Sequence, residues 1–109
     1  MNFEIISTPP FEREAKRLAK KYPSLKSDLG RLSIKLSANP SLGTPLGHQC
    51  FKIRLSITSK GKGKSGGARL ITHVRVTSGR IFLLSIYDKS EHENISNQEL
   101  LGRLMNLKQ

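Results

Sequence analysis

Two cationic residues lie two positions apart in a segment where apolar and polar residues alternate. They are Lys52 and Arg54, and the alternating segment runs from Cys50 to Ile57. Because every second residue of a strand projects from the same face, both side chains can reach one phosphate group. A lysine beside a guanidinium suits phosphoryl chemistry, since one group can move a proton while the other holds charge. The same pair also fits the solvated face of a half-exposed strand, so the pattern alone leaves both interpretations open.

One more cation occupies a position that suits a phosphate site, and another stands beside a carboxylate. Arg69 follows Gly66 and Gly67, and a glycine backbone can approach a ligand closely while a guanidinium binds two phosphoryl oxygens. An arginine at the start of a strand can equally be an ordinary surface residue. Lys89 follows an apolar segment and stands beside Asp88, a carboxylate with which it can pair.

The middle of the chain contains no carboxylate. From Leu29 to Tyr87 there are ten lysines and arginines and no aspartate or glutamate, in a chain of 109 residues with a net charge of +11. A polyanion is the natural partner of such a surface, since each phosphate contact adds attraction and releases counterions. Catalysis in this segment must use Lys, Arg, His or Tyr side chains, because paired carboxylates and carboxylate-bound metals are excluded. Metal-free RNA cleavage fits, since it needs a base, an acid and a stabiliser of phosphorane charge.

Hydrophobic periodicity predicts an α+β chain in the order β-α-α-β-β-β-α. The predicted elements are a strand at 2–7, helices after Thr8 and at 25–38, strands at 50–57, 68–77 and 80–87, and a last helix after the capping box at 96–99. The composition of residues 41–48 predicts a loop. We therefore expect one domain, residues 1–109, in which a small mostly antiparallel sheet carries an N-terminal helical hairpin and a C-terminal helix.

A glycine- and lysine-rich loop is predicted at residues 59–67. Its Gly-Lys-Ser sequence lacks the earlier glycine and the strand–loop–helix context of a nucleotide-binding loop. We predict instead that Lys60, Lys62 and Lys64 are movable contacts to RNA phosphates. The three histidines and the single cysteine lack metal-ligand spacing, so no metal and no cofactor is expected.

The order of elements and three motifs together resemble the RelE/ParE superfamily, the toxin halves of bacterial toxin–antitoxin pairs. The motifs are Cys50-Phe51-Lys52-Ile53-Arg54-Leu55, Gly67-Ala68-Arg69-Leu70-Ile71 and Ile86-Tyr87-Asp88-Lys89-Ser90-Glu91. The resemblance covers nearly the whole chain. Within the superfamily the chain is most similar to the RelE/HigB branch of type II systems, whose members cut messenger RNA in the ribosomal A site.

The resemblance implies a metal-independent, ribosome-dependent endoribonuclease. Its implied catalytic residues are Lys52, Arg54, Arg69 and Lys89. Tyr87 and His92 join the three loop lysines as implied RNA- or ribosome-binding residues, although Tyr87 equally fits a half-buried core position. Some relatives carry an arginine after the equivalent of Lys89 and a tyrosine near the last helix. Serines stand in those places here, at positions 90 and about 96, so the identity of the general acid stays open.

The resemblance also implies partners. A cognate antitoxin is expected to cover the basic cleft or to displace the C-terminal helix, and contact with DNA is expected only through that complex. The ribosome and messenger RNA are the other expected partners. No signal peptide and no apolar run of membrane-spanning length are present, so a cytoplasmic protein without membrane contact is expected. Two alternatives remain: a ParE-like inhibitor of DNA gyrase, which generally lacks the basic residue set, and a non-enzymatic RNA-binding protein.

Overall fold

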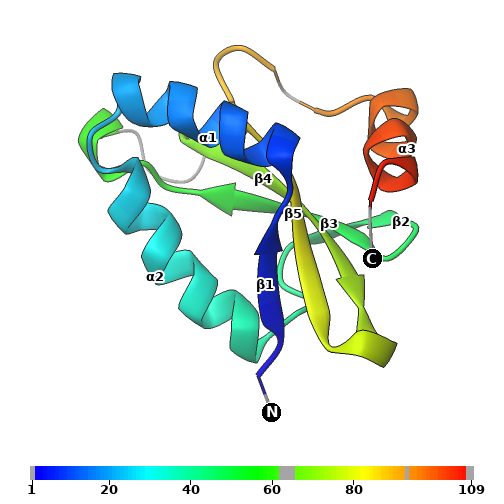
Figure 1. Ribbon diagram of the computed structural model, residues 1–109. Coiled ribbons are helices and arrows are strands. Elements are labelled where there is room, and N and C mark those ends of the chain that lie inside the picture. Colours follow the sequence, from blue (N-terminus) through cyan, green and yellow to red (C-terminus); the bar gives the residue numbers. More distant parts are fainter. Residues whose placement is uncertain (1, 62–65, 93, 108–109) are drawn as a thin grey trace.

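The computed structural model describes residues 2–61, 66–92 and 94–107 and shows a five-stranded sheet between two helical layers (Figure 1). The spatial order of the strands is β1-β5-β4-β3-β2. Only the β1–β5 pair is parallel among the pairs in this sheet. The strands are β1 Glu4–Ser7, β2 Thr44–Gly47, β3 Cys50–Leu55, β4 Ala68–Arg75 and β5 Arg80–Asp88. The predicted α+β class and the mostly antiparallel sheet are confirmed.

Helices α1 (Pro9–Lys21) and α2 (Leu25–Ala38) form the predicted N-terminal hairpin, and α3 (Asn97–Met105) is the predicted C-terminal helix. The capping box of α3 forms as expected, since the Ser96 side chain accepts a hydrogen bond from the Glu99 amide. At α1 the hydroxyl of Thr8 makes a different bond. It donates to the Leu83 carbonyl, 2.8 Å away on β5, and so ties the helix start to the sheet.

The loop predicted at residues 41–48 is wrong in part, because Thr44–Gly47 is strand β2. It pairs antiparallel with β3 across a bulge and forms the outer edge of the sheet. An edge strand tolerates Pro45, because a residue without an N–H can face away from the ladder. The turn into β3 places His48 and Gln49 at φ 55° and 58°, which matches a tight two-residue hairpin turn. Composition predicted a loop because turn-forming residues dominate this short strand.

Each face of the sheet carries its own apolar core. On one face, α1 and α2 bury a cluster that takes Ile53 and Leu55 from β3 and Leu70 and Ile86 from β4 and β5. On the other face, α3 contributes Leu100 to a smaller cluster, which contains Cys50, Ile71, Phe82, Leu84 and Tyr87 from the strands. This division follows the period-two alternation of the strands. Lys52 and Arg54 alternate with Ile53 and Leu55, so they share the face that carries α3.

A charged contact ties α3 to the rest of the molecule. Arg103 of α3 forms an ion pair with Glu14 of α1 at 2.8 Å and donates to the Leu84 carbonyl at 2.7 Å. The Glu14 carboxylate also accepts the amide hydrogen of Ile86, beyond the point where β1 ends. These contacts join α3 to both α1 and β5. In the part of the chain that the structure describes, no helix is long and apolar enough to cross a membrane.

Candidate functional site

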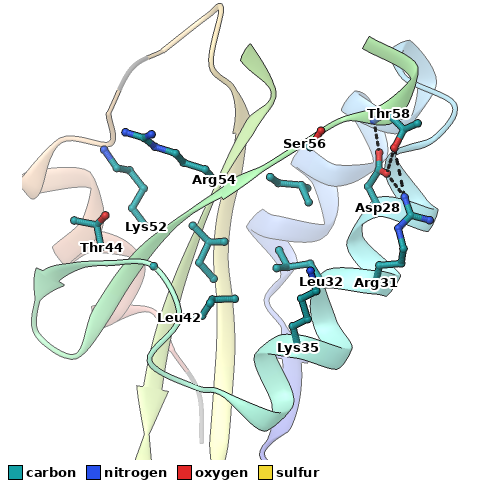
Figure 2. A pocket seen from close by; sticks show the side chains of 13 residues that line it. Asp28, Arg31, Leu32, Lys35, Leu42, Thr44, Lys52, Arg54, Ser56 and Thr58 are labelled. Atoms are coloured by element: carbon teal, nitrogen blue, oxygen red, sulfur yellow. Dashed lines mark hydrogen bonds and ion pairs between the residues drawn. The ribbon is translucent and has the colours of Figure 1, made fainter. Parts of the chain in front are cut away.

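Three of the predicted site residues form a row across adjacent strands. Arg54 of β3 pairs with Arg69 of β4, and Arg69 pairs in turn with Tyr87 of β5. Directly paired residues project from the same face of a sheet, so this row lies on the α3 side. Lys52 lies two residues before Arg54 on the same face. Figure 2 shows the two side chains extending together from β3, on the side away from α2.

The cations in this row differ in their surroundings. Arg54 is exposed, whereas Lys52 is half-buried and its Nζ donates a 2.7 Å hydrogen bond to Oδ1 of Asn94. Arg69 is only 3% exposed, and one of its guanidinium nitrogens donates to the Ala68 carbonyl at 3.1 Å. Asn94 was not singled out from the sequence. No pattern marks it, because its contact depends on the path of the segment between β5 and α3.

Tyr87 is the member of the row that packs into the apolar core on the α3 side. It is 6% exposed, and its ring meets the His92 ring edge-on at a centroid distance of 5.4 Å. Of the two interpretations left open by the sequence, the structure favours the core position, since little of the ring is accessible for stacking on a base. His92 is exposed and lies next to this buried ring.

Lys89 is brought next to the start of β4. Its amide donates to the Gly67 carbonyl at 3.0 Å, two residues from Arg69. Gly67 itself is required by packing: a Cβ atom there would lie 2.0 Å from the Leu55 carbonyl oxygen. The sequence suggested that this glycine lets the backbone approach a ligand. In the structure the close approach is to the neighbouring strand β3.

Lys60 does not occupy the movable position that was predicted for it. It ends a short 3₁₀ turn, Thr58–Lys60, and its Nζ lies 2.6 Å from Oδ1 of Asp88. The Lys60 side chain is 10% exposed and that of Asp88 is fully buried. Burial alone would lower the pKa of Lys60, but the Asp88 carboxylate outweighs it and raises that pKa. Lys62 and Lys64 lie outside the described residues.

An open groove of about 650 Å³ lies on the other side of β3, between that strand, β2 and α2 (Figure 2). Four apolar residues, Leu32, Leu42, Ile53 and Leu55, line it together with the cations Arg31 and Lys35 of α2. Lys52 and Arg54 also border the groove, although their side chains extend from β3 on the side away from α2. The single carboxylate among its lining residues is that of Asp28, which is 3% exposed. The accessible charge of the groove is therefore positive.

The Asp28 carboxylate is a structural anchor. It accepts hydrogen bonds from the amide of Thr58 at 2.9 Å and from its hydroxyl at 2.7 Å, and it contacts Arg31 and Ser24. Burial would raise the pKa of Asp28, but the hydrogen bonds outweigh it and hold the pKa below its usual value. The contact pins the beginning of the lysine-rich loop to α2.

A histidine and the cysteine meet at the far end of the sheet from Arg69. His73 Nδ1 lies 3.1 Å from the His48 carbonyl oxygen and 3.6 Å from Sγ of Cys50. Burial, and then the nearby Arg75, lower the pKa of His73, while burial raises the pKa of the Cys50 thiol to about 11. A thiol with so high a pKa is a poor nucleophile. Among the described residues, no three His, Cys, Asp or Glu side chains are grouped as metal ligands.

Known proteins share this architecture. Residues 6–106 match the family model described as the RelE toxin of the RelE/RelB toxin–antitoxin system. A free E. coli RelE toxin with two arginine-to-alanine substitutions is 15% identical at a TM-score of 0.66, covering 99% of this chain and 100% of that chain. The isolated E. coli RelE toxin is 17% identical at a TM-score of 0.62, covering 94% and 98%. The toxin–antitoxin complex RelBE2 from Mycobacterium tuberculosis contains a chain that is 16% identical at a TM-score of 0.61, covering 81% and 99%.

Proposed function

Because the chain belongs to the RelE toxin family of toxin–antitoxin systems, we propose that it is a ribosome-dependent endoribonuclease that cuts messenger RNA in the A site. The observation that carries the proposal is the row of Arg54, Arg69 and Tyr87 across three strands, with Lys52 on the same face. Two guanidinium groups on adjacent strands suit a phosphodiester that acquires negative charge as it is cleaved. The reaction needs no bound metal in this proposal.

The roles of the side chains follow from their surroundings. Arg69, which is 3% exposed, stabilises the phosphorane charge through its electric field from beneath the site, and the exposed Arg54 binds the phosphate from the solvent side. Lys52 and Lys89 carry the proton transfers, one at the 2′-hydroxyl and one at the departing 5′-oxygen. Tyr87 and Asn94 orient the site, through the ring contact to His92 and the hydrogen bond to Lys52.

The charge distribution supports binding to ribosomal RNA. The net charge is +11, and two of the eight carboxylates, Asp28 and Asp88, are buried and bonded within the protein. Their negative charge therefore does little to weaken attraction to phosphates. Lys62 and Lys64 extend this proposed ribosome contact beyond the described residues. Each phosphate contact releases counterions, so binding should depend steeply on salt.

A cognate antitoxin is the proposed protein partner. The RelBE2 complex from M. tuberculosis, whose toxin chain shares this fold, is a toxin bound to an antitoxin. We propose that the antitoxin of the present chain neutralises the cationic face of β3 and β4 in the cytoplasm. Contact with promoter DNA would then run through the complex, since the antitoxin occupies the face that binds RNA.

The test is cleavage of a messenger RNA by purified protein on programmed ribosomes. Cuts should appear within the A-site codon and should be absent without ribosomes. In cells, induced expression should arrest growth and halt translation, with the same cuts in messenger RNA. Intact messages alongside gyrase-linked double-strand DNA breaks would instead assign the chain to gyrase inhibition. Ribosome binding without cuts would make it a non-enzymatic RNA-binding protein.

A further inference from the structure

Asp88, the last residue of β5, is a fully buried carboxylate bonded to three separate segments. Its carboxylate accepts a hydrogen bond from the Tyr22 hydroxyl at 2.6 Å and forms an ion pair with Lys60 at 2.6 Å. They also accept the amide of Ser90 at 2.9 Å and its hydroxyl at 2.8 Å. A buried carboxylate is costly unless it is paired and hydrogen-bonded, so this set of contacts makes its position tolerable. The carboxylate thereby joins the end of α1, the 3₁₀ turn and the segment after β5.

The backbone of Asp88 organises the same segment. Its carbonyl accepts hydrogen bonds from the amides of Glu91 at 3.0 Å and His92 at 3.2 Å. Together with the side-chain bonds to Ser90, these contacts make residues 88–92 a closed turn. The turn sets where Lys89 leaves the strand, and it places the His92 ring against Tyr87.

The turn is also tied to the cationic row. Asp88 pairs with Ala68 in the β4–β5 register, and the Lys89 amide donates to the Gly67 carbonyl. Arg69 is the next residue on β4. A displacement of the turn would therefore change the separation between Arg69 and Lys89, two residues that the proposed reaction needs at one phosphate.

We propose that Asp88 is a positioning residue: with Lys60 as its buried counterion, it holds the 88–92 turn and so sets Lys89 and His92 against Arg69. The inference rests on the proposed ribonuclease function. Asp88 does not touch substrate, because its side chain is fully buried. The lysine that the sequence pointed to as an RNA contact, Lys60, acts in this arrangement from inside the protein.

The experiment compares Asp88→Asn with Tyr22→Phe. The first removes the negative charge that holds Lys60 and weakens the turn. The second removes one hydrogen bond to the same carboxylate on the α1 side and leaves the bonds of Ser90 in place.

Single-turnover cleavage is measured at saturating ribosomes and ribosome affinity is measured separately, both below the melting temperatures of the variants. Asp88→Asn should cut on the order of 10-fold more slowly, because even a small misplacement of the reacting groups slows the chemical step. Its affinity should stay within about two-fold, and Tyr22→Phe should cut at the wild-type rate.

Lys60→Met is the second variant and keeps the Ser90 bonds to Asp88. Its cleavage rate should lie between those of wild type and Asp88→Asn. If Asp88→Asn does not fold, the Lys60→Met rate tests the proposal in its place. The proposal would be overturned if Asp88→Asn and Lys60→Met both cut at the wild-type rate. It would also be overturned if these two variants and Tyr22→Phe all lost the same fraction of the cleavage rate.

If wild-type protein does not cut at all, the ribonuclease proposal fails separately. Amide exchange at residues 89–92 then tests the structural part, and unchanged protection in Asp88→Asn would overturn it.

Discussion

Two sets of cations on this molecule have opposite relations to its carboxylates. Arg103 and Lys60 are 17% and 10% exposed, and each is paired with a carboxylate from another element, Glu14 or Asp88. On β3, Lys52 donates to the neutral amide of Asn94 and Arg54 is exposed. No carboxylate of the described residues pairs with either β3 cation. The first set holds elements together, whereas the second leaves its charge available to a ligand.

Arg69 falls between these two sets, and its replacement should have the largest effect. It is buried like the structural cations but lies in the row with Arg54. Arg69→Ala should slow ribosome-dependent cleavage by on the order of 10²-fold, as loss of a transition-state charge stabiliser does. Ribosome association should remain largely intact. The measurement is cleavage at saturating ribosomes beside sedimentation of the complex, and wild-type cleavage would place Arg69 with the structural cations.

The comparison is sharpened by removing one cation from each set. Arg103→Met should lower the free energy of unfolding by about 1.5–3 kcal/mol, because it removes charged hydrogen bonds to Glu14 and to the Leu84 carbonyl. Cleavage per folded molecule should be unchanged. Arg54→Met is the matched control and should change stability by less than about 0.5 kcal/mol while lowering cleavage. Urea denaturation and the cleavage assay give both readouts, and an exchange of the two phenotypes would refute the division.

The sequence predicted the helices and strands whose apolar residues recur at helical or strand spacing. The helices and the three long strands, β3, β4 and β5, follow from the pattern of their apolar residues. The shared face of Lys52 and Arg54 follows from the alternation of apolar and polar residues on β3. Strand β2 was missed because a four-residue edge strand rich in turn-forming residues is defined by its partner. The hydroxyl of Thr8, at the start of α1, bonds to a carbonyl 75 residues away, and no local pattern predicts that contact.

The sequence named candidate residues for the site, but it did not predict the contacts between them. The row of Arg54, Arg69 and Tyr87 depends on the strand register, which no single segment encodes. The bond from Lys60 to Asp88 spans 28 residues. A lysine beside glycine resembles a solvated loop residue until its buried counterion is known. Composition therefore predicted the charge of this loop correctly but misplaced its first lysine.

The buried carboxylates predict how stability depends on pH. Hydrogen bonds and ion pairs outweigh burial and hold the pKa values of Asp28 and Asp88 below the usual 3.8. As pH falls, the unfolded chain therefore binds protons before the folded protein does. Their contribution to stability should be complete above about pH 5 and lost as pH drops toward the lowered pKa values. Urea denaturation as a function of pH measures this loss.

The control for this prediction is Asp88→Asn. It should be less stable than wild type at neutral pH, and its stability should fall less between about pH 5 and pH 2. Parallel curves for the two proteins would mean that Asp88 does not carry the acid sensitivity. The loss would then belong to Asp28 or to the exposed carboxylates.

The smallest effect separates the lysines of the loop. Replacing Lys62 and Lys64 by Gln should flatten the log–log salt dependence of ribosome binding by up to about two units, by analogy with nearly one per contact on duplex DNA. Lys60→Gln should leave that slope unchanged and lower the free energy of unfolding instead, because the Lys60 ammonium is paired with Asp88 inside the protein. Filter binding over a salt series supplies the slopes. A Lys60→Gln slope that drops by about one unit would mean that the ion pair opens on the ribosome, and the buried lysine would then belong with the cations that bind RNA.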